Sequence, residues 1–311
     1  MSLNVDEYVR GVISGDRRAI ARAITLIESD SAAARAFLAQ LPKRDRKALI
    51  IGVTGAPGAG KSTLLGRLAL DFAERGLDIG ILAIDPTSPF TGGAVLGDRL
   101  RMIDAALVDR IFIRSMASRG GIGGLSEAAE GAAKLLEASG KDVIMIETVG
   151  AGQSDVEVAR IADVVMLVVM PQTGDEIQSL KAGILEIADI VVVNKSDIPG
   201  AEATINILRN TLPNNIKILK TSALTGEGVR ELAEKILELR GKQDSTSQRR
   251  RKRIEDALAF AVIKHLTPQI TELIDSNKEM RKYVDMILER EITIEAAAHE
   301  IAQRLRHELK V

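Results

Sequence analysis

Residues 55–63 form the stretch whose residue types and spacing could most directly carry chemistry. They fit the pattern G-x-x-x-x-G-K-[ST] and lie between an apolar run at 48–54 and a helical pattern that opens at Leu64. Glycines in such a loop let successive backbone N–H groups point at one concave site, and the helix N-terminus adds positive potential. The pattern therefore predicts a site for a nucleoside triphosphate, with Lys61 at the β- and γ-phosphates as a catalytic group and Ser62 at a magnesium ion. The predicted nucleotide-binding residues of this loop are Gly55, Ala56, Pro57, Gly58, Ala59, Gly60, Lys61, Ser62 and Thr63.

A second motif, Asn194-Lys195-Ser196-Asp197, ends an apolar run and indicates which base is bound. The Asp197 carboxylate can accept hydrogen bonds from the guanine ring N–H and the neighbouring amino group. Adenine offers neither donor in that arrangement, so a carboxylate enclosed against adenine would be left without partners. Lys195 can lie along the base, and Asn194 can brace neighbouring loops. Ser222 and Ala223, after the next strand candidate, resemble the loop of G proteins in which a backbone N–H meets the base carbonyl.

Carboxylates at strand ends are candidates for the magnesium side of the site. Glu147 ends the run 142–147 and is predicted to bind the metal and to act in catalysis. Asp85 ends the run 79–85. Asp98 follows a Pro- and Gly-rich segment that could order around phosphate and magnesium and relax after hydrolysis, although a helix N-cap would explain Asp98 as simply.

The residues that would promote hydrolysis are harder to read, because phosphoryl transfer depends mostly on positioning and charge stabilisation. The backbone N–H of Gly150 suits a sensor of the γ-phosphate. Gln153 could orient water, and Lys181 could reach the nucleotide or a partner from the loop after 163–170. An ordinary strand-to-helix turn explains the loop of Lys181 equally well.

Strand-like and helical patterns alternate from residue 48 to residue 240, and several strand candidates are near-continuous apolar runs. Such runs are typical of strands covered on both faces, so the pattern predicts an α/β fold with a doubly wound, mostly parallel sheet. Ligands should collect at the carboxyl ends of the strands. The predicted strands are 48–54, 79–85, 110–115, 142–147, 163–170, 189–194 and 216–220; the helices between them are 61–75, 124–139, 155–161, 175–187, 200–212 and 228–240.

Helical patterns flank this domain on both sides. The expected division is an N-terminal helical extension at 1–45, a P-loop domain at 46–241 and a C-terminal helical, dimerising extension at 242–311. Residues 241–247 read as a polar linker, and the basic run 249–253 as the exposed start of a long helix.

Composition narrows the function classes. Of 311 residues 46% are hydrophobic but only 2% are aromatic, which predicts an aliphatic core, and the net charge of −1 favours neither nucleic acid nor a membrane surface as a partner. The absence of Cys excludes disulfides, thiolate zinc sites and cysteine nucleophiles. The N-terminus lacks the pattern of a signal peptide and no apolar run reaches the length of a membrane span, so the expected location is the cytoplasm.

Taken together, the motifs resemble the MeaB/ArgK-type GTPases, the G-protein chaperones of methylmalonyl-CoA mutase, which are grouped with the metal-insertion P-loop GTPases. The long gap between Gly55 and Glu147 fits this branch better than a compact Ras-like layout. The resemblance covers residues 4–311 and is carried by the segments 55–63, 85–93, 96–99, 118–125, 147–154 and 194–197.

The resemblance implies a protein that binds GTP and Mg²⁺, hydrolyses GTP slowly to GDP and phosphate, and associates with an adenosylcobalamin-dependent acyl-CoA mutase. It implies that the protein gates loading of the cobalamin cofactor and protects the mutase. By motif match, the mobile loops that couple nucleotide to mutase are 86–98, 148–155 and 172–183. Members of this family are commonly homodimers that use the terminal extensions.

Two alternatives stay open at this point. One is a nucleotide-dependent kinase or ATPase of a lysine/arginine/ornithine transport system, an older description of the same family. The other is a metal-insertion GTPase, which needs Cys and His ligands near the nucleotide or at the N-terminus. The chain has no Cys, and its first His is His265.

Overall fold

The computed structural model describes residues 5–29, 31–44, 47–86, 101–118, 124–148, 158–171, 187–213, 216–241 and 243–309. The chain divides into two compact units, Met1–Ile254 and Glu255–Val311. The division falls within one long helix, α13 (Gln243–Ser276). The expected domain boundaries at 45 and 241 stay a prediction.

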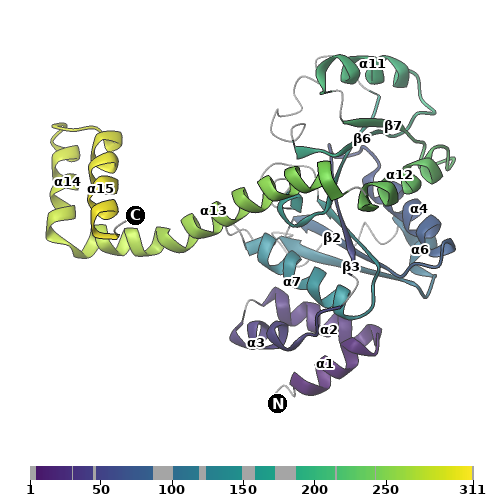
Figure 1. Ribbon diagram of the computed structural model, residues 1–311, viewed down its shortest axis with the longest axis horizontal. Coiled ribbons are helices and arrows are strands. Elements are labelled where there is room, and N and C mark those ends of the chain that lie inside the picture. Colours follow the sequence, from purple (N-terminus) through teal and green to yellow (C-terminus); the bar gives the residue numbers. More distant parts are fainter. Residues whose placement is uncertain are drawn as a thin grey trace. The chain divides into compact units, whose positions relative to one another are not determined.

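A seven-stranded parallel sheet forms the centre of the first unit, in the order β3-β2-β4-β1-β5-β6-β7 (Figure 1). The predicted α/β fold with a parallel sheet is confirmed. β3 continues to Ser118, beyond its predicted end at 115. The strands are β1 (Leu49–Thr54), β2 (Ile79–Pro86), β3 (Ile111–Ser118), β4 (Val143–Thr148), β5 (Val164–Val169), β6 (Ile190–Val193) and β7 (Lys217–Lys220).

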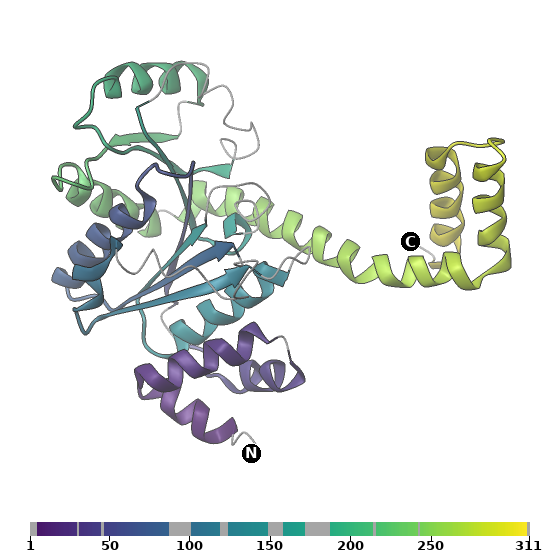
Figure 2. The ribbon, with the colours of Figure 1, turned by 180° about the vertical axis from the view of Figure 1, so that it is seen from behind.

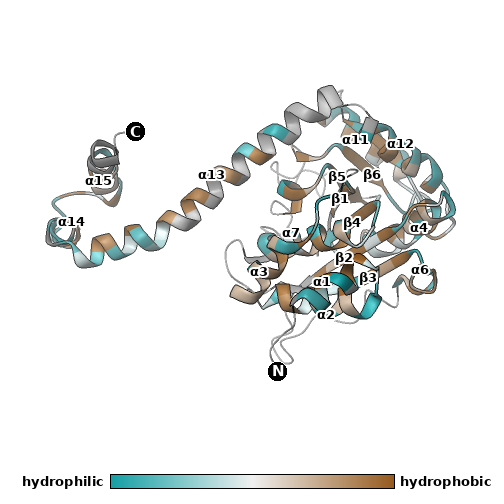
Figure 3. Ribbon diagram, turned by 60° about the horizontal axis from the view of Figure 1, so that its bottom comes forward, coloured by the Kyte–Doolittle hydropathy of each residue, from teal (hydrophilic) through white to brown (hydrophobic). Residues whose placement is uncertain are grey.

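Helices cover both faces of the sheet, which explains the continuous apolar runs of its central strands. On β4, Val143 and Met145 face one hydrophobic core while Ile144 and Ile146 face the other. The first core contains α4 (Lys61–Glu74), α6 (Ile103–Ala106) and α12 (Val229–Gly241). The second contains α7 (Gly124–Ala138) and the N-terminal helices, while α11 (Ala201–Thr211) packs on β5 and β6. Figure 3 shows hydrophobic residues concentrated in the strands at the centre.

The N-terminal helices pack against α7 and the sheet rather than apart from them, as Figure 2 shows from behind. Ile24 and Phe37 are fully buried in this core, and each such side chain contributes about 1.5–3 kcal/mol of burial. Asp16 caps the second of these helices, and hydrogen bonds from the backbone N–H groups of Ala19 and Arg18 lower the pKa of its carboxyl. The helices are α1 (Val5–Ile13), α2 (Arg17–Glu28) and α3 (Ala32–Gln40).

Aspartates fix the amino-terminal edge of the sheet. The Oδ2 atom of Asp163, just before β5, accepts a hydrogen bond from the N–H of Ile50 at 2.9 Å. Asp189, just before β6, accepts from Val165 in the same way at 2.9 Å. Asp142, just before β4, accepts from the N–H of Asp78 at 3.0 Å. Each carboxylate satisfies a backbone donor on the neighbouring strand or at its start, which holds the register of the parallel strands.

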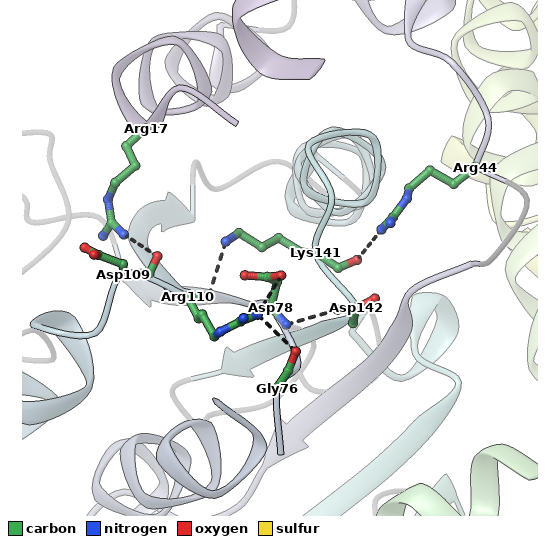
Figure 4. Close-up of polar contacts among 8 residues, drawn as sticks. All are labelled: Arg17, Arg44, Gly76, Asp78, Asp109, Arg110, Lys141 and Asp142. Carbon is green, nitrogen blue, oxygen red and sulfur yellow. Dashed lines mark hydrogen bonds and ion pairs between the residues drawn. The ribbon is translucent and has the colours of Figure 1, made fainter. Parts of the chain in front are cut away.

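Basic side chains bridge the same edge (Figure 4). Lys141 Nζ donates to the carbonyl of Arg110 at 3.2 Å, and burial lowers the pKa of Lys141. Arg17 of α2 donates to the carbonyls of Asp109 at 3.2 Å and Ile111 at 3.0 Å, which fastens the N-terminal helices to the start of β3. This edge lies opposite the carboxyl ends of the strands, where the predicted site residues are.

The C-terminal part is helical, but one expectation about it is wrong. Residues 241–247 were expected to form a linker, whereas α12 runs to Gly241 and α13 starts at Gln243. Residues 243–253 include neither Gly nor Pro, so no residue of this segment stops a helix. The basic run 249–253 therefore lies inside α13.

In the second unit, α14 (Lys278–Leu288) packs on α15 (Ile294–Leu309) through the buried residues Met280, Tyr283 and Ala297. The hydroxyl of Tyr283 donates to Glu300 Oε2 at 2.9 Å. Among the residues that the structure describes, no helix has both the length and the apolarity needed to cross a membrane.

Candidate nucleotide-binding site

The described site residues gather at the carboxyl edge of the sheet. Residues 55–60 leave β1 and lead into α4, while Glu147 lies level with Val53 of β1 and Ala83 of β2. The guanine motif follows β6, and Thr221 follows β7. Because all these strands are parallel, their ends meet at one edge, as the sequence predicted.

Two glycines of the loop are required by its geometry. Gly55 has φ +144°, and a Cβ there would overlap the carbonyl of Val168 on β5. Gly60 has φ +85° at the N-cap of α4, and a Cβ there would lie 2.5 Å from Asn194 Nδ2. Any side chain at either position would displace the loop from the strand or from the guanine motif.

Lys61 is buried inside the curve of its own loop. The residue is only 6% exposed. Its Nζ donates to the carbonyl of Gly55 at 2.8 Å and to that of Ala56 at 3.2 Å. Pro57 and Gly58 form the exposed crest of the loop. The N–H donors of Lys61 lie inside the loop, where phosphate oxygens could take the place of the carbonyls as acceptors.

Ser62 and Glu147 meet behind the loop. Ser62 Oγ donates to Glu147 Oε1 at 2.8 Å, and both residues are buried. The pair brings a hydroxyl and a carboxylate together at the first turn of α4. Hard oxygen ligands of this kind are those that Mg²⁺ prefers, usually together with water and substrate phosphates, so the pair fits the predicted metal.

Asn194 ties the phosphate loop to the loop after β7. Its Nδ2 donates to the carbonyl of Ala59 at 2.8 Å. Its Oδ1 accepts from Thr221 Oγ1 at 3.1 Å and from the N–H of Ala223 at 3.0 Å. Asn194 is 1% exposed, so these bonds are shielded from water. The bracing role expected of Asn194 is thus seen in the structure.

The rest of the guanine motif is more open. Lys195 has φ +57°, an uncommon value for a residue with a side chain, and its Nζ lies 3.9 Å from Met170 Sδ. Asp197 is exposed, so enclosure of its carboxylate would depend on the base itself. Ser222 Oγ accepts from the N–H of Thr225 at 3.2 Å and shapes its own loop.

Comparison with known proteins fits this arrangement. The sequence profile of the family described as "Methylmalonyl Co-A mutase-associated GTPase MeaB" matches residues 20–277. The chain belongs to the MeaB family. The resemblance seen in the sequence motifs is confirmed. Membership of a GTPase family implies that a guanine nucleotide is the ligand of the P-loop.

Relatives of this chain carry names that agree with the family. A candidate GTPase of Pyrococcus horikoshii is 43% identical over 310 residues, covering 92% of this chain and 98% of the relative. The GTPase ArgK of Escherichia coli is 37% identical over 249 residues, covering 75% of each. A mitochondrial methylmalonic aciduria type A homolog of Caenorhabditis elegans is 38% identical over 209 residues, covering 62% of this chain and 52% of the relative.

A solved structure supports the fold of this chain. The crystal structure of an LAO/AO transport system kinase superposes with a TM-score of 0.74 at 24% identity, covering 98% of this chain and 99% of the other. At that identity the likeness concerns the fold alone.

Several predicted site residues of this MeaB-family chain are not placed. Asp98, Gly150, Gln153 and Lys181 lie outside the described residues. The backbone of Asp85 pairs with Ala117 near the end of β2, while its side chain is outside the description.

One residue that contacts this site was not foreseen. Arg67 of α4 donates to the carbonyls of Ala223 at 3.2 Å and Leu224 at 3.4 Å. The contact joins residues far apart in sequence, so no motif spacing could reveal it. The only available signal was the position of Arg67 on the helix that begins at the phosphate loop.

Proposed function

We propose that this protein binds GTP with Mg²⁺, hydrolyses it to GDP and phosphate, and uses this cycle to gate adenosylcobalamin loading and protection of an acyl-CoA mutase of the methylmalonyl-CoA type. The observation that carries the nucleotide part is the bonding of Asn194 to Ala59 on one side and to Thr221 and Ala223 on the other. One buried side chain fixes the distance between a phosphate loop and a base loop.

On the phosphate side, Lys61 exchanges the carbonyls of its loop for the β- and γ-phosphate oxygens and balances their charge. Ser62 and Glu147 are the described residues that would hold Mg²⁺, together with Asp85 and Asp98 from the sequence. When bound, the metal neutralises developing charge on the phosphates. Backbone N–H groups of residues 56–63 cradle the phosphates at the start of α4.

On the base side, Asp197 accepts from the guanine ring N–H and amino group, Lys195 lies along the base, and the loop of Ser222 and Ala223 meets the base carbonyl. Gly150 senses the γ-phosphate. Gln153 and Lys181 are the groups proposed to orient the attacking water and to stabilise charge at the nucleotide. The support for these last three is their place in the sequence motifs.

The mutase as partner is supported by the family description and by the name of the nematode relative. We propose that three segments contact the mutase and transmit to it whether GTP or GDP is bound: 86–98, 148–155 and 172–183. Loss of the γ-phosphate would change the order of such loops and so the affinity for the partner.

A homodimer is supported by an apolar row on α13. Leu258, Val262, Leu266 and Ile270 follow one another at intervals of one helical turn, and all are exposed. A continuous apolar row on a soluble helix is typical of a surface that another copy or partner covers. Sedimentation analysis of the chain and of a Leu258→Glu/Leu266→Glu variant tests this: the wild type should be a dimer and the variant a monomer, and a monomeric wild type would overturn it.

The main test is hydrolysis. Purified protein should release phosphate from GTP, and Lys61→Ala should abolish release, while Arg75→Ala, an exposed change at the other end of α4, should retain it. Addition of a cobalamin-dependent mutase should raise the rate in the wild type. Phosphate release by Lys61→Ala at the wild-type rate would refute the site, and failure of every such mutase to bind in a pull-down would refute the chaperone role.

A further inference from the structure

Arg67 connects the helix of the phosphate loop with the loop proposed to meet the base. It lies on α4, and the phosphate-binding residues Lys61 and Ser62 begin the same helix. The guanidinium Nε donates to the carbonyl of Ala223 at 3.2 Å and a terminal nitrogen donates to Leu224 at 3.4 Å. One planar fork thus spans two successive carbonyls of the base loop.

Ala223 is consequently held from both sides. Its N–H donates to Asn194 Oδ1 at 3.0 Å, a buried contact, and its carbonyl accepts from Arg67, an exposed residue. Asn194 belongs to the strand side of the site and Arg67 to the helix side. The orientation of the Ala223 backbone is therefore fixed relative to β6 and α4 together.

The base loop has its own internal bonds and can behave as one body. The N–H of Gly226 donates to the carbonyl of Ser222 at 2.8 Å, and the N–H of Ser222 donates to Glu227 at 3.0 Å. Bonds of this kind set the shape of the loop but not its distance from the phosphates. That distance depends on contacts that leave the loop, such as those of Arg67 and Asn194.

We propose that Arg67 is a positioning residue for guanine recognition. It holds the backbone of residues 223 and 224 at a fixed distance from the phosphate loop, so that base and phosphates are bound together. The inference rests on the proposed binding of guanine nucleotides and adds a residue to that site. Arg67 touches no nucleotide atom in this account; it acts through the carbonyls of the base loop.

The expected effect is moderate because Arg67 is an exposed residue and its bond to Ala223 is only partly buried. A hydrogen bond from a charged group at the surface stabilises the folded arrangement only modestly. Its loss should therefore speed GDP release by about five- to tenfold. Arg67→Lys replaces the two donating guanidinium nitrogens by one ammonium. It should therefore reverse about half of the increase in the GDP release rate. Arg75→Ala is the matched control, because Arg75 is an exposed arginine at the C-cap of the same helix and pairs with Asp71 and Glu234 rather than with the base loop.

The experiment measures GDP dissociation rates and the affinities for GDP and ADP in wild type, Arg67→Ala, Arg67→Lys and Arg75→Ala. Adenine carries an amino group where guanine carries a carbonyl, so a misplaced base loop should weaken GDP but leave ADP nearly unchanged. The ratio of GDP to ADP affinity should fall about five- to tenfold in Arg67→Ala and by less than twofold in Arg75→Ala. Purely structural damage would weaken both nucleotides by one factor.

The outcomes separate this inference from the proposed function. Equal affinity of the wild type for GDP and ADP would refute guanine recognition and the role of Arg67 with it. A wild-type preference for GDP that Arg67→Ala retains in full, or an equal loss for both nucleotides, would refute the positioning role alone. Rapid GDP release in Arg67→Ala, partly restored by Arg67→Lys, would support it.

Discussion

Replacement of Asn194 by alanine should separate the phosphate loop from the base loop. The change removes the donor to Ala59 and the acceptor shared by Thr221 and Ala223. All these groups are buried, so the carbonyl, the hydroxyl and the N–H left behind lose their partners where water is scarce. The variant therefore tests whether this side chain connects the two halves of the site.

The magnitude follows from the number of groups left unpaired. Each buried polar group without a partner costs about 1–3 kcal/mol, and water entering the space of the lost side chain offsets part of it. We expect the free energy of unfolding to fall by about 3–5 kcal/mol, a large share of the roughly 5–15 kcal/mol of an ordinary domain. GDP affinity should fall about 10- to 100-fold, because binding must then also order the two loops.

Two further variants divide this effect. Asn194→Asp keeps an acceptor for Thr221 and Ala223 but puts an oxygen in place of the nitrogen that lies 2.8 Å from the Ala59 carbonyl. It should weaken the link to the phosphate loop alone. Thr221→Val removes only the hydroxyl bond and should cost about 1 kcal/mol.

Urea unfolding followed by circular dichroism is the suitable assay, since the chain has no Trp to serve as a fluorescent probe. GDP binding is measured by calorimetry on the same samples. An Asn194→Ala protein that unfolds within about 0.5 kcal/mol of the wild type and binds GDP equally well would refute the argument, because surface changes alone are of that size.

Other changes test other parts of the account. Gly60→Ala should lower GDP affinity at least about tenfold by calorimetry, because its Cβ meets Asn194 Nδ2 at a φ of +85°. Glu147→Gln still accepts from Ser62 but loses its charge, so the Mg²⁺ concentration for half-maximal hydrolysis should rise; an unchanged titration would exclude Glu147 from the metal site. Burial lowers the pKa of Lys141, so between this lowered pKa and the ordinary value of 10.5 the unfolded chain binds more protons than the folded chain. Thermal unfolding should show the wild type gaining stability relative to Lys141→Met as pH rises from 8 toward 10.5, and a falling difference would contradict this sign.

The layout of the sheet could be predicted because each of its determinants is local. A run such as Val164–Val169 is apolar throughout, which indicates a strand covered on both faces, and β5 occupies that place. The loop at 55–60 and the motif at 194–197 were predictable for the same reason, since each follows an apolar run. Parallel pairing then brings their ends to one edge.

What could not be predicted depends on pairings between distant segments. The fork of Arg67 on Ala223 and Leu224 needs the packing of α4 against the loop after β7, which no local pattern encodes. The polar composition of residues 241–247 predicts a linker, and this prediction is wrong because α13 starts at Gln243. Residues 243–247 include neither Gly nor Pro, so none of them stops a helix. The low helix propensity of these polar residues is a weak predictor, because the helix that follows can extend through them.

We infer that the site selects guanine through Asp197 while Lys61 holds the phosphates. Calorimetric titration of GDP and ADP into the wild type and into Asp197→Asn tests it most directly. We expect the wild type to bind GDP at least about a hundredfold more tightly than ADP, and we expect Asp197→Asn to lose most of this preference while it stays folded. Equal binding of GDP and ADP by the wild type, or an unchanged preference in Asp197→Asn, would contradict it.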